Sequence, residues 1–242
     1  RRVRKSQAFV SFTVGSGIVA LVGFGLNLFL IPLLVRRFGF DLKDAALTFA
    51  FTFSAATALG GVIGGLLADR FASNNYRRYG LLPMVSTAFA LPLFLAAIFQ
   101  DDWRILAVLL FAATFCLYAF LPTIMTVTQR LVEPRMRATA AAIHAFGQTV
   151  FGLGLGSAFL GWMSDRLASR DYGTGYAADC LSGQAGLAGE DGLPASACLA
   201  ASGTGLQQAM LLLGLFLLLA IASYWVAARS ISAEINLQEG RP

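Results

Sequence analysis

The sequence contains little charge. Charged residues make up 13% of the 242 residues and hydrophobic residues 57%, whereas a soluble domain carries about 25% charged residues. Water is a poor solvent for a chain of this composition. The shortage of charge therefore excludes an ordinary soluble domain and favours a protein that lies in a lipid bilayer.

Charged side chains are absent from six long stretches, which predict the topology. A helix rises about 1.5 Å per residue, so about 20 residues cross the roughly 30 Å hydrocarbon layer. The stretches are too long and too continuously apolar to be the strands of a membrane barrel. The sequence therefore predicts an all-α, polytopic membrane protein whose six transmembrane helices cover residues 9–34, 45–68, 81–99, 105–128, 138–163 and 206–228.

The chain is also poor in residues that carry out chemistry. It has one histidine and three cysteines, and the six stretches contain no Asp or Glu. An intramembrane hydrolase would need a nucleophile with its base, or a group of metal ligands, within these stretches. We therefore predict a protein that is not an enzyme and that holds no cofactor and no metal.

Two of the cysteines, Cys180 and Cys198, lie between the last two stretches, among small and polar residues. An oxidising compartment permits a disulfide between them, but the sequence leaves open whether they are bonded. Cys116 lies inside the fourth stretch, where a small apolar side chain suits a packed helix.

The basic residues predict the orientation. Four segments that share one side of the predicted membrane carry 12 of the 18 Lys and Arg residues. They are the amino end, residues 69–80, residues 129–137 and the tail after residue 228. Segments rich in Lys and Arg stay in the cytoplasm. We expect a cell inner (plasma) membrane protein with both chain ends cytoplasmic and residues 164–205 as a long exoplasmic loop. The net charge of +5 then reflects topology and predicts no nucleic-acid partner.

Glycines four residues apart predict close contacts between helices, because they let two backbones approach. These pairs are Gly60 with Gly64, Gly61 with Gly65, and Gly152 with Gly156.

The sequence also contains an internal repeat. The second stretch ends in Gly65-Leu-Leu-Ala-Asp-Arg-Phe-Ala-Ser73 and the fifth in Gly161-Trp-Met-Ser-Asp-Arg-Leu-Ala-Ser169, with Gly, Asp-Arg and Ala-Ser in register. Three crossings separate the copies, so they end on opposite sides of the membrane. Two three-helix units of inverted topology have this arrangement, which is typical of secondary transporters.

The first copy also resembles a known signature. Gly65-Leu-Leu-Ala-Asp69-Arg70, followed by Arg77 and Arg78, is similar to a cytoplasmic loop of the major facilitator superfamily. Three further segments strengthen the resemblance, and in order they are similar to helices seven to twelve of a spinster-type member: Val22–Gly25, Glu133–Thr139 and Gly152–Gly156. Here the basic pair is delayed by an insertion after Arg70, which loosens the match to the loop.

The resemblance implies a function. It implies the carboxyl-terminal half of a twelve-helix transporter that works by alternating access, with an amino-terminal six-helix half encoded upstream of Arg1. It also implies that Gly65, Asp69, Arg70, Arg77 and Arg78 belong to a loop that holds the cytoplasmic side closed. The alternative is that Asp69, Arg70, Arg77 and Arg78 only fix the topology.

Polar residues and proline at membrane depth are the candidates for a substrate cavity, because polar groups that face lipid are costly. His144 and Gln148 share one helix face, and Pro122 should kink its helix and free a carbonyl group. His144 is also the one intramembrane group that titrates near neutral pH, and it is either a pH-responsive residue or a structural one. The candidates are Asn27, Tyr118, Pro122, Met125, Thr126, His144 and Gln148.

The substrate class follows less directly from the sequence. The 20 Phe residues and the absence of intramembrane cations favour an amphipathic lipid or an organic anion as the small-molecule substrate. A proton is a candidate coupling ion, although these stretches contain no carboxylate to carry it. The alternative function is a membrane receptor or scaffold that keeps the fold without transport.

Overall fold

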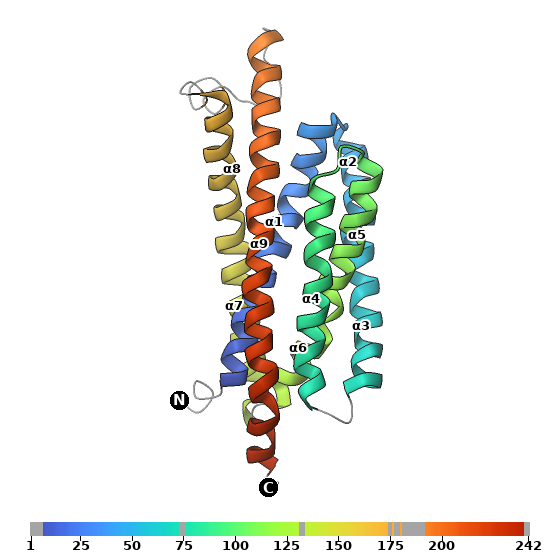
Figure 1. Ribbon diagram of the computed structural model, residues 1–242, viewed down its shortest axis with the longest axis vertical. Helices are drawn as coiled ribbons and strands as arrows, with labels where there is room; N and C mark the ends of the chain where they lie inside the picture. The colour runs from blue at the N-terminus through green and yellow to red at the C-terminus, as the bar shows by residue number, and fades with distance from the viewer. Residues whose placement is uncertain are drawn as a thin grey trace.

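The computed structural model describes residues 7–72, 76–130, 134–173, 176, 180 and 192–239. Within these residues every regular element is a helix, and the long helices run side by side along one axis (Figure 1). They are α1 (Gln7–Phe38), α2 (Leu42–Phe49), η2 (Ala50–Ala55), α3 (Ala56–Ala72), α4 (Tyr76–Ile98), α5 (Trp103–Ala119), α6 (Leu121–Arg130), η3 (Pro134–Met136), α7 (Arg137–Thr149), η4 (Val150–Gly156), α8 (Ser157–Tyr172) and α9 (Gly192–Glu239).

Six helical segments of the described chain are long and apolar enough to cross a membrane, as the sequence predicts. The second segment joins α2, η2 and α3, the fourth joins α5 and α6, and the fifth joins α7, η4 and α8. Both η2 and η4 are π-helical. Such widened turns are often found at functional sites in helices.

The last two long helices, α8 and α9, extend further than hydropathy predicts. Within the predicted loop over residues 164–205, α8 continues to Tyr172 and α9 begins at Gly192. With 48 residues, α9 is about 72 Å long, more than twice the hydrocarbon thickness. Backbone hydrogen bonds, and not side-chain polarity, determine where a helix ends. A helix can therefore be longer than the apolar stretch within it.

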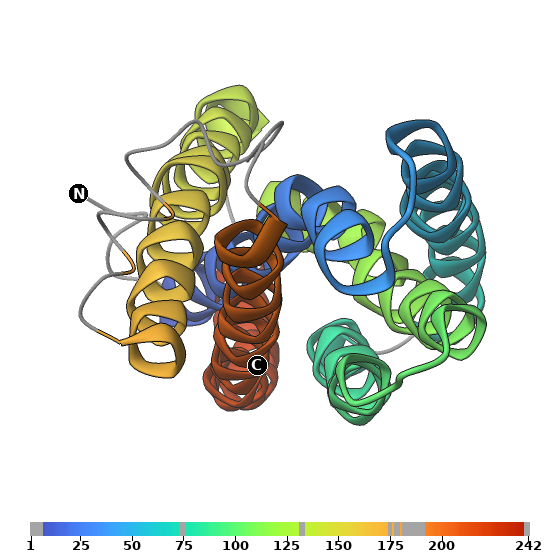
Figure 2. The same ribbon diagram turned by 90° about the horizontal axis from the view of Figure 1, so that it is seen from above.

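The helices form an open, curved arrangement seen from above (Figure 2). There α1 and the α5–α6 segment occupy the middle, α2–α3 and α7–α8 form the two flanks, and α4 and α9 lie along the lower side of the view. Contacts agree with this view, since α9 packs on α1, α4 and α8, while α3 packs on α5 and η4 on α1. The core between them is apolar and includes Phe12, Leu33, Phe94, Leu213 and Tyr224.

Both flanks approach the middle helices through glycine. A methyl group at Gly60 would lie 2.6 Å from the Phe115 carbonyl oxygen of α5, and one at Gly64 would overlap the next turn of that helix. On the other flank, a methyl group at Gly156 would lie 2.7 Å from the Leu21 carbonyl oxygen of α1. The predicted close packing is therefore confirmed for these glycines. In contrast, a methyl group at Gly61 would meet nothing within 4 Å.

The two copies of the repeat end at opposite ends of the molecule, as inverted topology requires. The carboxyl end of α3 lies at the same end as both termini, and the carboxyl end of α8 lies at the other (Figure 1). The described part of the first copy stops at Ala72, because Ser73 lies outside the described residues.

Candidate functional site

The fourth membrane segment is interrupted at Phe120, shortly before the position where the sequence predicts a kink. α5 ends at Ala119 and α6 begins at Leu121, directly before Pro122. Proline has no amide hydrogen, so the Tyr118 carbonyl loses its helical donor, and the amide of Phe120 bonds it instead. The hydroxyl of Ser86 donates to the Cys116 carbonyl from α4. Backbone groups freed at the break therefore find partners inside the bundle, as a membrane interior demands.

A pocket of about 300 Å³ lies beside this break, between α3 and the α5–α6 segment. Its lining residues are Thr57, Gly61, Tyr118, Leu121, Pro122 and Met125. Three of them, Tyr118, Pro122 and Met125, are among the residues predicted from the sequence. Thr57 and Gly61 were not predicted as pocket residues. Small residues occur all around α3, so the sequence does not show which face of α3 packs on α5 and lines the pocket.

Tyr118 joins three segments at the pocket wall. Its ring meets the edge of Phe53 in η2 with centroids 5.6 Å apart and an interplanar angle of 80°. Its hydroxyl oxygen would lie 3.0 Å from a methyl group placed on Gly23 of α1. Within the described residues, no hydrogen bond engages this hydroxyl. Tyr118 is one of two pocket-lining residues that carry a hydroxyl group, the other being Thr57.

The remaining cavity candidates are spread over other helices. Asn27 is partly exposed on α1, and the hydroxyl of Thr126 donates to the Pro122 carbonyl at 3.0 Å within α6. Gln148 is partly buried on α7, which packs on α1 and α6 in the flank opposite to α3 (Figure 2). The structure thus brings three of the seven candidates to one pocket and leaves Gln148 on the other flank.

His144 is completely buried on α7. Neither of its ring nitrogens has a hydrogen-bond partner among the residues that the structure describes. An imidazole carries one donor and one acceptor when neutral, and leaving buried polar atoms unpaired costs about 1–3 kcal/mol for each. His144 is therefore part of the packed interior rather than of the open pocket.

The loop signature lies close to the pocket at one end. A methyl group on Gly65 would lie 3.7 Å from Cγ of Pro122, so this glycine of the signature faces the break in the fourth segment. Asp69 and Arg70 are exposed at the end of α3, and Arg78 is exposed on α4. The side chain of Arg77 lies outside the described residues.

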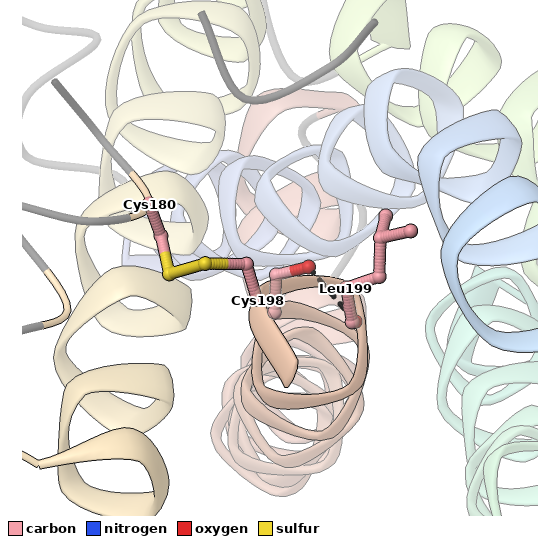
Figure 3. The surroundings of a disulfide bond; sticks show 4 residues. Cys180, Cys198 and Leu199 are labelled. Carbon is pink, nitrogen blue, oxygen red and sulfur yellow. Dashed lines mark hydrogen bonds between the residues drawn. A yellow bond between two sulfur atoms is a disulfide. The ribbon is translucent and has the colours of Figure 1, made fainter. Parts of the chain in front are cut away.

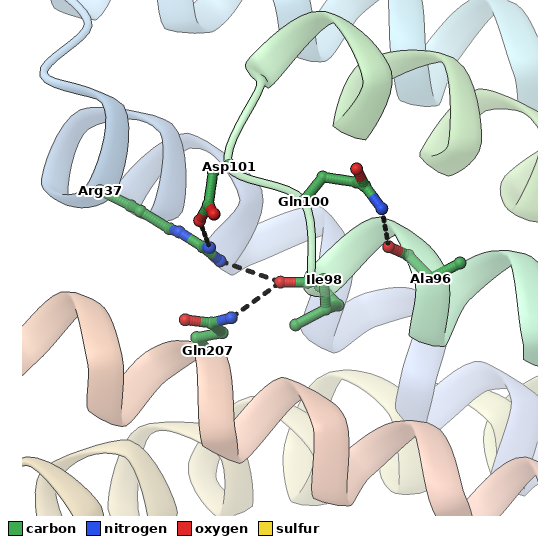
Figure 4. Close-up of polar contacts among 6 residues, drawn as sticks. All are labelled: Arg37, Ala96, Ile98, Gln100, Asp101 and Gln207. Atoms are coloured by element: carbon green, nitrogen blue, oxygen red, sulfur yellow. Dashed lines mark hydrogen bonds and ion pairs between the residues drawn. The ribbon is translucent and has the colours of Figure 1, made fainter.

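A polar cluster at the opposite end of the molecule was not predicted from the sequence. Arg37 donates to the Ile98 carbonyl at 2.9 Å and pairs with Asp101 at 2.9 Å (Figure 4). Gln207 of α9 donates to the same carbonyl at 2.8 Å. The cluster therefore ties together the ends of α1 and α4 and the side of α9. Its residues lie far apart in the sequence, so no local pattern signals it.

The same end of the molecule carries a disulfide between Cys180 and Cys198, whose Cα atoms lie 5.6 Å apart (Figure 3). The bond answers the question that the sequence left open. Nearby, burial and the Asp165 carboxylate raise the pKa of the Tyr176 phenol above its ordinary value, and Arg36 acts in the opposite direction. Asp165 of α8 and Arg36 of α1 therefore act in opposite directions on a buried tyrosine that follows α8.

Comparison with known proteins places this arrangement among transporters. No protein-family model matches the chain. An MFS-type efflux pump of Mycolicibacterium smegmatis (strain ATCC 700084 / mc(2)155) is 30% identical over 164 residues, which are 67% of this chain and 38% of that protein.

Two solved structures match almost the whole chain. Both are crystal structures of a bacterial homologue of the human lysosomal transporter Spinster. The inward-facing and occupied form has a TM-score of 0.80 and 27% identity, covering 97% of this chain and 51% of that one. The inward-facing and unoccupied form has a TM-score of 0.84 and 29% identity, covering 97% and 50%. The chain spans about half the length of these structures.

The fold is that of a polytopic helical membrane protein whose six spanning segments correspond to half of a transporter. The chain belongs to the major facilitator superfamily and is similar to its spinster branch. This confirms the resemblance seen in the sequence. It also places the chain in a family of transporters rather than of enzymes.

Proposed function

We propose that this chain is the carboxyl-terminal half of a secondary transporter that moves a small molecule by alternating access. The observation that carries the proposal is the pocket at the broken fourth segment, where Tyr118, Pro122 and Met125 meet α3. Substrate sites of secondary transporters commonly lie near the bilayer midplane beside discontinuous helices. The other half of the site then belongs to an amino-terminal six-helix half.

The orientation proposed from the basic residues gains support from the disulfide. Disulfides persist in oxidising compartments and are rare in the cytosol. Cys198, which is bonded to Cys180, lies in the first two turns of α9, and that end of α9 is opposite to both chain termini (Figure 1). We therefore assign that end to the outside of an inner membrane, and the ends of α1 and α9 near the termini to the cytoplasm.

The substrate class that fits the pocket best is an amphipathic lipid or an organic anion. Leu121, Pro122 and Met125 provide apolar walls, and among the residues that the structure describes no charged side chain lines the pocket. A sugar would need several polar partners, because a buried hydroxyl without one is costly. Any coupling proton would need its acidic carrier in the other half, since the described spanning segments bury no carboxylate.

The loop signature would act as a latch on the cytoplasmic side. Asp69 is exposed at the end of α3, where it can bond free amide groups at the amino end of a helix in the other half. Gly65 lies beside Pro122, so a change at the latch can be passed directly to the pocket wall. Arg70, Arg77 and Arg78 would support Asp69 there or set the topology.

Uptake by the intact transporter tests the proposal. The protein is reconstituted in liposomes, and uptake of a labelled single-chain phospholipid and of a labelled organic anion is followed with and without a pH gradient. We expect uptake of at least one probe. Tyr118→Ala should reduce it, whereas Phe89→Ala, on an exposed face of α4, should not. No uptake of any probe, with a protein partner still bound, would instead favour a receptor or scaffold.

A further inference from the structure

We propose that the hydroxyl of Tyr118 binds a hydrogen-bond acceptor on the polar end of an amphipathic ligand, and that Gly23 is the residue that positions it. This inference rests on the proposed function, because it concerns the same pocket. It adds a specificity-determining atom and a positioning residue on a different helix.

The position of the hydroxyl depends on the missing side chain at Gly23. A methyl group there would lie 3.0 Å from the hydroxyl oxygen of Tyr118 and 3.7 Å from the ring carbon that bears it. The first distance is shorter than an ordinary van der Waals contact, whereas the second is ordinary. An alanine at position 23 would therefore displace the hydroxyl oxygen by a few tenths of an ångström, whereas the ring carbon could stay in place.

The ring of Tyr118 is held from the other side by aromatic contacts. Phe53 meets it at an angle of 80°, and Phe49 stacks on Phe53 with centroids 5.4 Å apart. Edge-to-face contacts of this kind favour one orientation of the ring. Tyr118 is thus clamped between η2 and α1, so its hydroxyl is a fixed group.

The Tyr118 hydroxyl is also the polar side-chain group of the pocket lining that is not already used as a hydrogen-bond donor within the protein. Thr57, the other hydroxyl residue there, already donates to the Phe53 carbonyl at 2.7 Å. The remaining lining side chains are apolar or absent. Since no hydrogen bond engages the Tyr118 hydroxyl within the described part of the chain, it can donate to a ligand.

These features define the ligand by its chemistry. Its apolar part packs on Leu121, Pro122 and Met125, and its polar end carries an acceptor oxygen that lies toward α1. Asn27 follows Gly23 by one helical turn on the same face of α1, and it is partly exposed. It can therefore provide a second polar contact for the same end of the ligand.

Binding to the intact protein in detergent tests the inference independently of transport. The probe is lysophosphatidylglycerol, a single-chain phospholipid, and the Kd is measured for the wild type and for Tyr118→Phe, Gly23→Ala and the double variant. Loss of one neutral hydrogen bond should raise Kd about three- to tenfold in Tyr118→Phe. Gly23→Ala should raise it by a similar factor, but should add little in the Tyr118→Phe background.

Gly17→Ala is the matched control, because a methyl group there meets Phe151 at an ordinary 3.5 Å and Gly17 also lies in α1. Its Kd should equal that of the wild type. A wild-type Kd in Tyr118→Phe, equal effects of Gly23→Ala in both backgrounds, or no binding of the probe by the wild type would each overturn the inference. If the four Kd values follow this pattern but the intact protein takes up no probe, the proposed transport function is wrong while the proposed binding site is still supported.

Discussion

The guanidinium of Arg37 donates a hydrogen bond of 2.9 Å to the carbonyl oxygen of Ile98, and so joins the last turn of α1 to the last residue of α4. The same guanidinium pairs with Asp101, but the Asp101 side chain is 97% exposed while that of Arg37 is 17% exposed. Exposed ion pairs contribute about 0–1 kcal/mol. The bond to the backbone is therefore the stronger part of the contact.

Arg37→Met and Asp101→Asn should differ in their effects on stability. Arg37→Met removes a charge-assisted hydrogen bond and should lower the free energy of unfolding by about 1.5–3 kcal/mol. Asp101→Asn should change it by less than about 0.5 kcal/mol. Thermal unfolding of both variants in detergent checks this. If Asp101→Asn proves as damaging as Arg37→Met, the ion pair and not the Ile98 contact holds this end together.

The two glycine pairs of α3 should also respond differently to alanine. Gly64→Ala places a methyl group on the backbone of α5 at Ala119, which cannot move aside as a side chain can. Overpacking of this kind costs about 1–3 kcal/mol. Gly61→Ala meets nothing within 4 Å and should leave stability unchanged or slightly higher. Melting temperatures of the two variants make the comparison, and equal values would contradict the packing of α3 on α5.

Reduction of the disulfide should destabilise the protein. Cys180 and Cys198 are 18 residues apart in the sequence. Closing a loop of this size restricts the unfolded chain, which corresponds to up to about 3 kcal/mol in the chain-entropy treatment. We expect a reducing agent to lower the melting temperature of the wild type and not that of the Cys180→Ser, Cys198→Ser double variant. An unchanged wild-type melt, with both thiols shown to be free, would refute this.

His144→Leu separates a structural from a pH-responsive histidine. Because the buried ring nitrogens have no partner among the described residues, an apolar replacement should not lower stability and can raise it by about 1 kcal/mol. If His144 responds to pH during transport, the pH dependence of uptake should flatten in His144→Leu and in His144→Gln. An unchanged profile in both variants would leave it a structural residue, and a large loss of stability would reveal an unseen partner.

Hydropathy was sufficient to locate the six membrane segments, because the contrast between hydrocarbon and water acts on each stretch of chain separately. The interruption of the fourth segment before Pro122 could also be predicted from local sequence, because the missing amide hydrogen of proline disturbs its own helix whatever surrounds it. The carboxyl end of α8 and the amino end of α9, in contrast, could not be located from local hydropathy. Charged residues such as Asp165 and Arg166 belong to α8, because a helix continues for as long as its backbone hydrogen bonds do, whatever the charge of its side chains.

The site was predictable only in part, for a related reason. Tyr118, Pro122 and Met125 could be assigned to one face because they lie on one segment with helical spacing. Thr57 and Gly61 could not, because their role depends on which side of α3 faces α5. Gly60 and Gly64 have the same spacing as Gly61 and Gly65, and the sequence does not distinguish the packed pair from the other.

The amino-acid sequence by itself determined the solvent of this protein, the number of its crossings and the sign of charge at each end, since these depend on composition summed along short stretches. The tertiary structure decided which glycines face a neighbouring helix, that Cys180 meets Cys198, and that the Tyr118 hydroxyl lies against Gly23. Those contacts join residues from separate helices. They depend on how the helices rotate and approach one another, and the order of residues along any one helix does not specify this.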